Sequence, residues 1–211
     1  MKTMIAIPCM DTVPTAFLMS LLGLEKGSDC DVTLSVSSLI YDARNQLAQK
    51  AVDGNYDRIL WLDSDMQFDR DLMTRLHAAL DEGADMVSAL FFKRKPPIAP
   101  VIYKAIWCTQ EESGATMPHA DLYHDYPRDQ VFEIAACGFG GVMMKVDLVK
   151  AVKEKFGLPF SPIMGFGEDL SFCVKARETG ARLVCDSRIK MGHVGFTVFN
   201  EESYLQRRDA P

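Results

Sequence analysis

Two aspartates one residue apart follow an apolar segment in the first half of the chain. Residues 58–62 have the composition of a buried strand, and Asp63, Ser64 and Asp65 come directly after it. Because alternate side chains of an extended segment point the same way, Asp63 and Asp65 can face one cavity. Neighbouring carboxylates repel each other unless a cation lies between them, and oxygen ligands favour a hard ion such as Mg²⁺ or Mn²⁺. The segment therefore predicts a divalent-metal site.

The alternative is a solvated turn in which one aspartate caps the next helix. Residues 70–81 show a helical pattern with leucine at every fourth position from Leu72. Asp69 stands directly before this pattern, and aspartate is a preferred N-cap residue. We therefore expect Asp69 to cap the helix, which leaves the aspartate pair free for another role.

Two further segments carry residues suited to catalysis. Glu168 and Asp169 follow Gly167 at the start of a predicted helix, where acidic residues also serve as ordinary helix caps. His193 lies between two glycines beyond a predicted strand. A lone histidine is more often structural than a ligand, but flanking glycines permit a close approach to a bound molecule. The aspartate pair, the acidic pair and the histidine together favour a functional site.

The elements that would position these residues alternate between strand and helix over the first 92 residues. Strand patterns cover residues 3–8, 32–36, 58–62 and 86–92, and helical patterns cover residues 14–24, 41–52 and 70–81. This alternation predicts a parallel sheet with helices on both faces. Ligands of such sheets bind beyond the carboxyl ends of the strands, which is where the aspartate pair lies.

The remainder of the chain is less regular. Further strands are predicted at residues 131–136, 142–146 and 183–185, with the segment 189–193 after the last of them, and helices at residues 147–156 and 168–179. We interpret residues 93–100, which are basic and proline-rich, as an extended connector that could also reach phosphates or an acceptor. Residues 107–129 lack periodicity and read as a long loop, in which Trp107 could stack on an acceptor.

Composition limits the classes of partner. The 211 residues carry 23 Lys and Arg against 29 Asp and Glu, a formal net charge of −6. Nucleic-acid binding needs a basic face, so we expect no nucleic-acid partner, whereas one metal ion can neutralise a small phosphate ligand. The six cysteines contain no Cys-x-x-Cys pair and read as reduced core residues. Without a signal-peptide pattern or an apolar run of ~20 residues, we expect a cytoplasmic protein without a membrane span.

The sequence resembles the glycosyltransferase A-fold superfamily, in particular its inverting family with an Asp-x-Asp motif. The matching segments are Ile5-Ala6-Ile7-Pro8, Ala43-Arg44-Asn45, Asp63-Ser64-Asp65, Gly138 to Gly141, Gly167-Glu168-Asp169 and His193. They cover roughly residues 3 to 195. The chain departs from the pattern at Pro8-Cys9-Met10-Asp11, where a polar turn with Tyr and Asn is more usual, and in its short acceptor region. Both departures concern the identity of the substrates.

The resemblance implies a three-layer α/β/α Rossmann-like fold with a mostly parallel central sheet. We expect one domain over residues 1–211, with a nucleotide-binding half at 1–92, an acceptor and catalytic half at 93–195 and a tail at 196–211. It implies that Asp63, Asp65 and His193 bind Mn²⁺ or Mg²⁺, that Asp169 is the catalytic base, and that Glu168 positions the acceptor or the sugar. The implied nucleotide-sugar contacts are Pro8, Asp11, Ser37, Arg44, Asp63, Ser64, Asp65, Gly140 and Gly141.

The function implied is transfer of a sugar from a nucleotide-sugar, a UDP-sugar in our interpretation, to a hydroxyl acceptor with inversion. A metal can stabilise the departing diphosphate, so only one base is needed to take the proton of the acceptor. One alternative is a sugar nucleotidyltransferase, but its Gly-rich, Arg-containing loop has no counterpart in residues 9–15. A second alternative is a non-catalytic module of the same fold that binds nucleotide-sugars.

Overall fold

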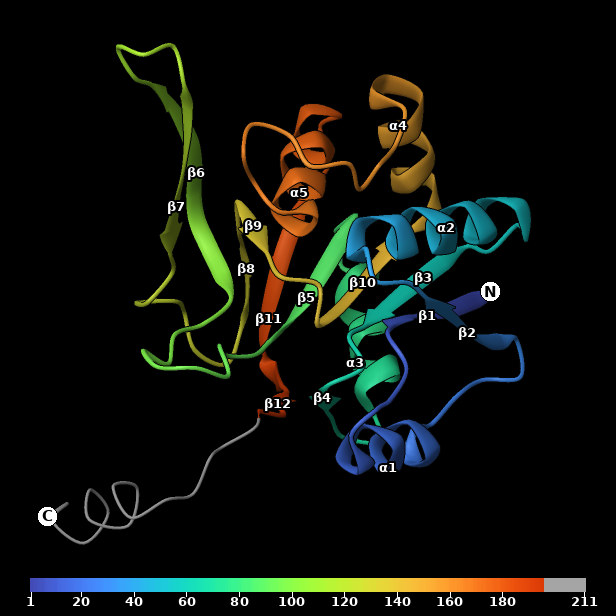
Figure 1. Ribbon diagram of the computed structural model, residues 1–211. Coiled ribbons are helices and arrows are strands. Elements are labelled where there is room, and N and C mark those ends of the chain that lie inside the picture. Colours follow the sequence, from blue (N-terminus) through green and yellow to red (C-terminus); the bar gives the residue numbers. More distant parts are fainter. Residues whose placement is uncertain (196–211) are drawn as a thin grey trace, which may run out of the picture.

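A seven-stranded sheet forms the middle layer of the protein in the computed structural model, which describes residues 1–195 (Figure 1). The strand order is β2-β1-β3-β10-β5-β11-β8. The strands are β1 (Thr3–Cys9), β2 (Cys30–Val36), β3 (Arg58–Leu62), β5 (Met86–Leu90), β8 (Val131–Glu133), β10 (Gly141–Lys145) and β11 (Leu183–Lys190). All of them except β8 and β10 run in one direction. The predicted α/β fold with a mostly parallel central sheet is confirmed.

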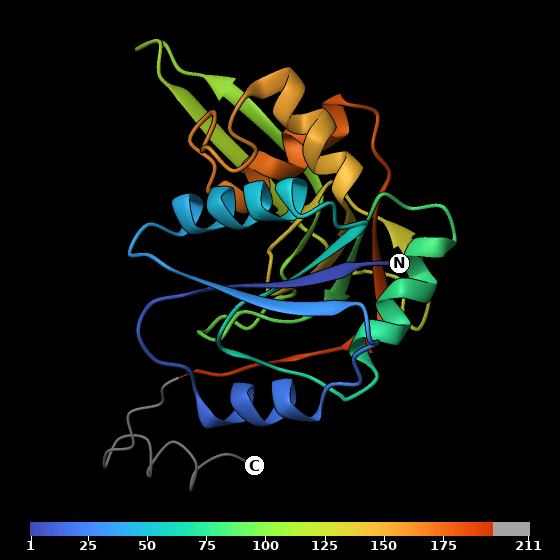
Figure 2. The same cartoon turned by 90° about the vertical axis from the view of Figure 1, so that its right-hand side faces the viewer.

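Helices cover both faces of this sheet (Figure 2). The helices α2 (Ile40–Asp53), α4 (Val146–Phe156) and α5 (Glu168–Glu178) pack on one face, and α1 (Thr15–Gly23) and α3 (Leu72–Asp81) on the other. The strand β3 shows why both faces are apolar. Its residues Ile59 and Trp61 belong to the core cluster under α2, α4 and α5, and Leu60 and Leu62 belong to the cluster under α1 and α3. Alternating side chains of a fully buried strand thus fill two cores.

Two small sheets stand at the edges of the large one. The short strands β4 (Met66–Gln67) and β12 (Gly192–His193) pair antiparallel, with His193 opposite Met66. The other small sheet joins β9 (Ala136–Cys137) to a hairpin of β6 (Ile102–Gln110) and β7 (Thr116–Leu122). The β4–β12 pair matters most for function, because it brings the end of the described chain next to the turn after β3.

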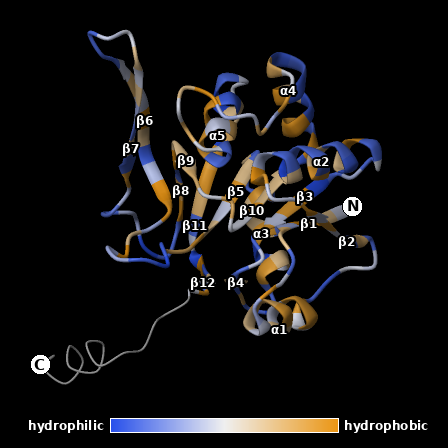
Figure 3. Ribbon diagram, viewed as in Figure 1, coloured by the Kyte–Doolittle hydropathy of each residue, from blue (hydrophilic) through white to orange (hydrophobic). Residues whose placement is uncertain are grey.

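The loop predicted at residues 107–129 is wrong, because most of it belongs to the β6–β7 hairpin. A register shift between Tyr103 and Ala105 interrupts the alternation of β6, and neither strand of the hairpin has one fully buried face. Hydropathy is accordingly mixed along the hairpin, whereas the central strands are mainly hydrophobic (Figure 3). A strand with one clean apolar face is the signal that sequence reasoning depends on, and it is missing here.

The predicted cap at Asp69 is also wrong. The helix α3 begins at Leu72, its N-cap position is Asp71, and no side chain caps it. The backbone carbonyl of Asp69, rather than its carboxylate, accepts a hydrogen bond from the Leu72 N–H at 3.2 Å. Asp69 therefore does not take over a capping role from the aspartate pair, and the roles of Asp63 and Asp65 depend on their own contacts.

Other predicted elements differ in extent. The strand expected at 131–136 is divided into β8 and β9, and the strand expected at 183–185 continues as β11 to Lys190. Among the helices of residues 1–195, none combines the length and the apolar character that crossing a bilayer requires. The predicted tail, residues 196–211, lies outside the described residues.

Candidate active site

The turn after β3 is held by backbone hydrogen bonds from two directions. The N–H of Asp63 donates to the carbonyl of Gly140 at 3.3 Å, just before β10. The carbonyl of Asp65 accepts from the N–H of Val194 at 2.8 Å, just after β12. Because β10 and β12 come from the second half of the chain, the turn is fixed by segments far from it in sequence. It lies at the carboxyl end of β3, where ligands of parallel sheets bind.

Asp65 and His193 face each other across the β4–β12 pair. The Nε2 atom of His193 lies 3.4 Å from Oδ2 of Asp65, and its Nδ1 atom lies 2.9 Å from the carbonyl oxygen of Phe92. A carbonyl can only accept a hydrogen bond, so it fixes Nδ1 as a donor and turns Nε2 toward Asp65. The ring of Phe91 packs edge-on against the imidazole, with centroids 6.0 Å apart. The imidazole is thus oriented from two sides.

Two basic groups, His193 and Arg94, lie at the Asp65 carboxylate. Burial by itself raises the pKa of Asp65, but the hydrogen bond to His193 and the charges of His193 and Arg94 hold that pKa below its ordinary value. The pKa of His193 is raised, mainly by its hydrogen bond to Asp65. The guanidinium of Arg94 forms an ion pair with the same carboxylate oxygen. Asp65 therefore stays ionised and interacts with both His193 and Arg94.

Asp65 and His193 fit a divalent ion that is completed by phosphate oxygens. A carboxylate oxygen and an oriented imidazole nitrogen are common metal ligands. Within residues 1–195, no three His, Cys, Asp or Glu side chains gather closely enough to hold a metal ion. Asp63, the third expected ligand, instead accepts a hydrogen bond from Arg44. Mg²⁺-type sites commonly use one or two carboxylates together with substrate phosphates, so a two-ligand protein site remains chemically reasonable.

Arg44 joins the aspartate turn to the start of α5. Its Nη2 atom donates to Oδ1 of Asp63 at 2.8 Å, and its Nε atom donates to Oε1 of Glu168 at 3.2 Å. The side chain is only 2% exposed and lies over the rings of Trp61 and Phe139, whose centroids are 5.7 and 5.3 Å from the guanidinium carbon. A buried guanidinium needs carboxylate partners, and Asp63 and Glu168 are those partners here. In the structure Arg44, which the resemblance places near the diphosphate, bridges two acidic segments.

Asp169 lies in the first turn of α5 and is half-buried. Burial, aided by the charge of Glu168, raises its pKa to about 6, although the Leu170 N–H and Arg44 act in the opposite direction. The N–H of Leu170 donates to Oδ1 at 2.7 Å. The glycine turn before β10 lies against the other oxygen, since a Cβ atom added to Gly138 would be 3.7 Å from Oδ2. A carboxylate with this pKa is suited to accept a proton near neutral pH.

The remaining expected contacts lie at the same edge of the sheet. Pro8 is buried in β1, Asp11 is exposed just beyond β1, and Ser64 is half-buried in the aspartate turn. The N–H of Ser37 donates to the carbonyl of Cys9 at 3.2 Å, which brings the end of β2 to the end of β1. These positions border one region, in which Ser64 is the direct neighbour of Asp65 in the chain.

The glycines before β10 have a packing role. A Cβ atom at Gly140 would meet Met66 Sδ at 2.9 Å and the ring of Phe91 at 3.0 Å, and one at Gly141 would meet Met191 Sδ at 2.2 Å. The protein's own side chains therefore fill the space that glycine leaves, which accounts for both glycines without a ligand.

Two site residues were not predicted from the sequence. Arg94 was interpreted as part of a connector, yet it pairs with Asp65; a basic run that follows a predicted strand beside the acidic turn was the available signal. Tyr103 lies near Asp169, whose charge adds to burial in raising the pKa of the tyrosine hydroxyl. No pattern pointed to Tyr103, because its place depends on the unpredicted hairpin.

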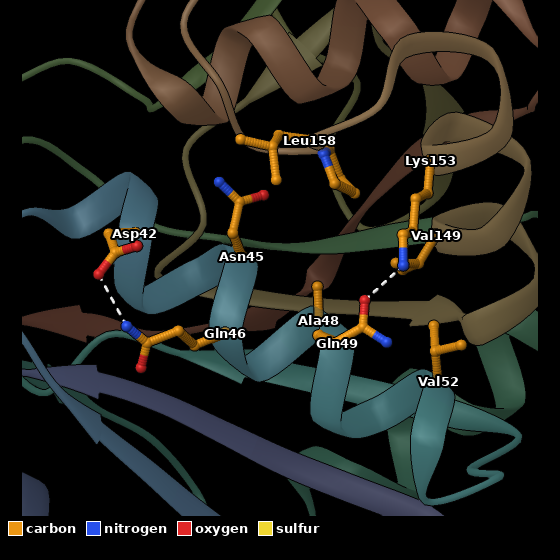
Figure 4. Close-up of a pocket in the computed structure, with 10 residues that line it drawn as sticks. Asp42, Asn45, Gln46, Ala48, Gln49, Val52, Val149, Lys153 and Leu158 are labelled. Atoms are coloured by element: carbon orange, nitrogen blue, oxygen red, sulfur yellow. Dashed lines mark hydrogen bonds between the residues drawn. The ribbon is translucent and has the colours of Figure 1, made fainter.

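A cavity of about 270 Å³ opens between α2 and α4 (Figure 4). Its lining comes from α2, α4 and the segment after α4: Asp42, Asn45, Gln46, Ala48, Gln49, Val52, Val149, Lys153, Leu158 and Pro159. None of these is an expected site residue. The cavity is therefore distinct from the aspartate turn.

Solved structures show which fold this arrangement matches. Protein A197 from STIV superposes with a TM-score of 0.68 at 19% identity, covering 93% of this chain and 87% of that one. GalNAc-T7, solved with UDP, GalNAc and Mn²⁺, superposes with a TM-score of 0.63 at 11% identity, covering 93% of this chain and 43% of that one. The chain has a glycosyltransferase A-like fold. Searches of protein-family models and of curated proteins gave no match.

Proposed function

We propose that this chain is a metal-dependent glycosyltransferase that moves a sugar from a nucleotide-sugar, a UDP-sugar, to a hydroxyl acceptor with inversion. The observation that carries the proposal is the single network at the carboxyl edge of the sheet. In the turn after β3, Asp65 lies opposite His193. Asp63 of the same turn accepts a hydrogen bond from Arg44, which also donates to Glu168 at the start of α5. The UDP and Mn²⁺ in the GalNAc-T7 structure support the choice of donor and metal.

The residues divide the chemistry between the two ends of this network. Asp65 and His193 would hold Mn²⁺ or Mg²⁺, which when bound supplies positive charge against the departing diphosphate. Arg94 provides further positive charge at the same carboxylate. Asp169 accepts the proton of the acceptor hydroxyl, and Glu168, held by Arg44, orients the acceptor or the sugar. A base that activates the acceptor opposite the leaving group gives inversion, as in inverting glycoside hydrolysis.

The deciding experiment measures donor hydrolysis and transfer over a panel of nucleotide-sugars, with and without Mn²⁺. Asp169→Asn should lower turnover about 10²- to 10⁴-fold, the usual contribution of a positioned base, while donor binding is kept. Asp147→Asn is the matched control, because Asp147 is also a first-turn acid but is exposed on α4.

Four outcomes would contradict the proposal. Full turnover by Asp169→Asn would remove the assigned base, and metal-independent activity would remove the role of Asp65 and His193. A product that keeps the anomeric configuration of the donor would exclude inversion. Binding of a nucleotide-sugar without turnover over a broad acceptor panel would favour the non-catalytic binding module instead.

A further inference from the structure

Six large apolar side chains are exposed on α1 and β2. They are Leu18, Met19, Leu22, Val32, Leu34 and Val36, each between 40% and 71% exposed. We call them the α1–β2 patch. The sequence of α1 is apolar on nearly every side, and helices of that kind are normally buried. Isolated exposed apolar residues are ordinary, but neighbouring ones on two elements indicate a contact surface.

The two parts of the patch lie on the same face of the sheet. In the parallel pairing of β1 with β2, Ile5 is opposite Val32 and Ile7 is opposite Leu34. Partners in a sheet point to the same face, and Ile5 and Ile7 share a core cluster with Phe17 of α1. The exposed side chains of β2 therefore point to the side that α1 covers. Figure 2 looks onto this edge of the sheet, with α1 below β2.

The strand β2 is also an unprotected edge. It stands at the end of the seven-stranded sheet and, among the described residues, pairs only with β1. Edge strands are usually guarded against further pairing by lysine, proline or a bulge. The five residues 32–36, Val-Thr-Leu-Ser-Val, contain no charge and no proline, and their pairing with β1 is unbroken. Such an edge is suited to accept another strand.

We infer that β2 pairs antiparallel with β2 of a second copy of this chain, about a two-fold axis at Leu34. This register sets Val32 opposite Val36 of the second copy and Asp31 opposite Ser37, so no two carboxylates meet. A two-fold axis perpendicular to the sheet keeps each face on its own side. The apolar side chains of both strands then form one stripe, and the exposed sides of the two α1 helices flank it.

The surrounding charges favour a second copy over a lipid surface. The segments that flank α1 and β2 in the chain carry Asp11, Glu25 and Asp29, and β2 itself carries Asp31, whereas Lys26 is the basic residue among them. Membrane-binding surfaces carry clustered basic residues, which an anionic leaflet attracts. A bilayer would also leave the backbone N–H and C=O groups of the β2 edge without partners, whereas a second strand satisfies them.

Sedimentation equilibrium of the full chain tests the pairing. The wild type should sediment at twice the chain mass of 23.6 kDa. Leu34→Lys places two positive charges opposite each other at the axis and should raise the dimer dissociation constant at least about 100-fold. Leu158→Lys is the control, because Leu158 is also exposed but lies after α4, and it should remain dimeric. Circular dichroism verifies that both variants fold.

Disulfide trapping tests the register without weakening the interface. Opposed Cα atoms in an antiparallel pair lie about 4.5–5.5 Å apart, within disulfide range. Oxidised glutathione should therefore convert Leu34→Cys into a covalent dimer, and the yield should exceed the amount of covalent dimer that the wild type forms under the same conditions. Val32→Cys should not, because the two copies of residue 32 would be about 13 Å apart.

The inference is overturned by a monomeric wild type at 100 µM, by a Leu34→Lys variant that still dimerises, or by equal trapping of the two cysteine variants. It is also overturned if the wild type is a monomer that co-sediments with phosphatidylcholine vesicles, since the patch would then be a lipid-binding surface.

Discussion

At the scale of single residues, Asp169 must be ionised to accept a proton, and its surroundings oppose ionisation. Its pKa is about 6 because burial and Glu168 disfavour the charged form. We expect kcat/KM to increase as the pH rises through 6 and to level off above about pH 7. A pH–rate profile in the presence of Mn²⁺ measures this. A profile that is flat between pH 5 and 8 would assign the base elsewhere.

The same shift predicts an effect on stability. The folded pKa of about 6 lies above the ordinary value near 3.9, so the protonated carboxyl stabilises the folded state below about pH 4, and this contribution is lost as the pH rises through 6. Asp169→Asn, which cannot ionise, should therefore raise the free energy of unfolding by roughly 2 kcal/mol at pH 8 and by almost nothing at pH 4. Urea denaturation at the two pH values measures the difference, with Asp147→Asn as the unaffected control.

The loss of Arg44 should also lower stability. Arg44→Met leaves the carboxylates of Asp63 and Glu168 without their cation in a region that is mostly buried. Breaking a buried pair costs about 3–5 kcal/mol, and the partial exposure of Asp63 reduces our expectation to about 2–4 kcal/mol. Arg44→Lys should recover only part of this, because an ammonium cannot match the spacing of the two carboxylates. A loss below about 1 kcal/mol in urea denaturation would show that Arg44 does not brace the site.

At the scale of elements, the glycine segment before β10 packs against side chains that in turn contact His193. A Cβ atom at Gly140 would press on Met66 and on the Phe91 ring, which packs against His193. Gly140→Ala should therefore destabilise the fold by about 1–3 kcal/mol, the usual cost of overpacking, and weaken Mn²⁺ binding. Gly27→Ala is the control, since no atom lies within 4 Å of its added Cβ. Thermal unfolding and Mn²⁺ titration of both variants measure the two effects.

The elements also show where sequence reasoning works. The central strands and the helices beside them were predictable, because buried strands are continuously apolar and the helices have four-residue leucine or alanine spacing. The hairpin was not, since its register shift and half-exposed strands remove the alternating pattern. Arg94 and Tyr103 were not predicted as site residues for a related reason, because their contacts are set by turns and sheets far from them in sequence. Residue type was enough to select the acidic residues and the histidine of the site: Asp63, Asp65, Glu168, Asp169 and His193. The pairing of Asp63 with Arg44 could not be predicted from the sequence.

At the scale of the whole molecule, the expected ligands would connect segments from the middle and the end of the described chain. UDP and Mn²⁺ together should stabilise the protein by about 2.7 kcal/mol at 100 times the dissociation constant, which corresponds to roughly 5–10 °C in Tm for a domain of this size. Either ligand alone should give a much smaller shift, because each supplies part of the other's site. Thermal scans with UDP, Mn²⁺, both, and both with excess EDTA measure this dependence. Equal shifts with UDP alone and with both would argue against a shared metal site.

The position of β10 has a consequence for biosynthesis. This strand lies between β3 and β5, yet it is made roughly 50 residues after β5. At about 5–20 residues per second, a ribosome needs several seconds to deliver it. Throughout that interval the emerging amino-terminal strands have an unfilled gap in their centre and two apolar edges that can pair wrongly. A nascent chain arrested near residue 92 should therefore be a good client for chaperones and should become protease-resistant only once the strand beyond residue 141 has left the exit tunnel.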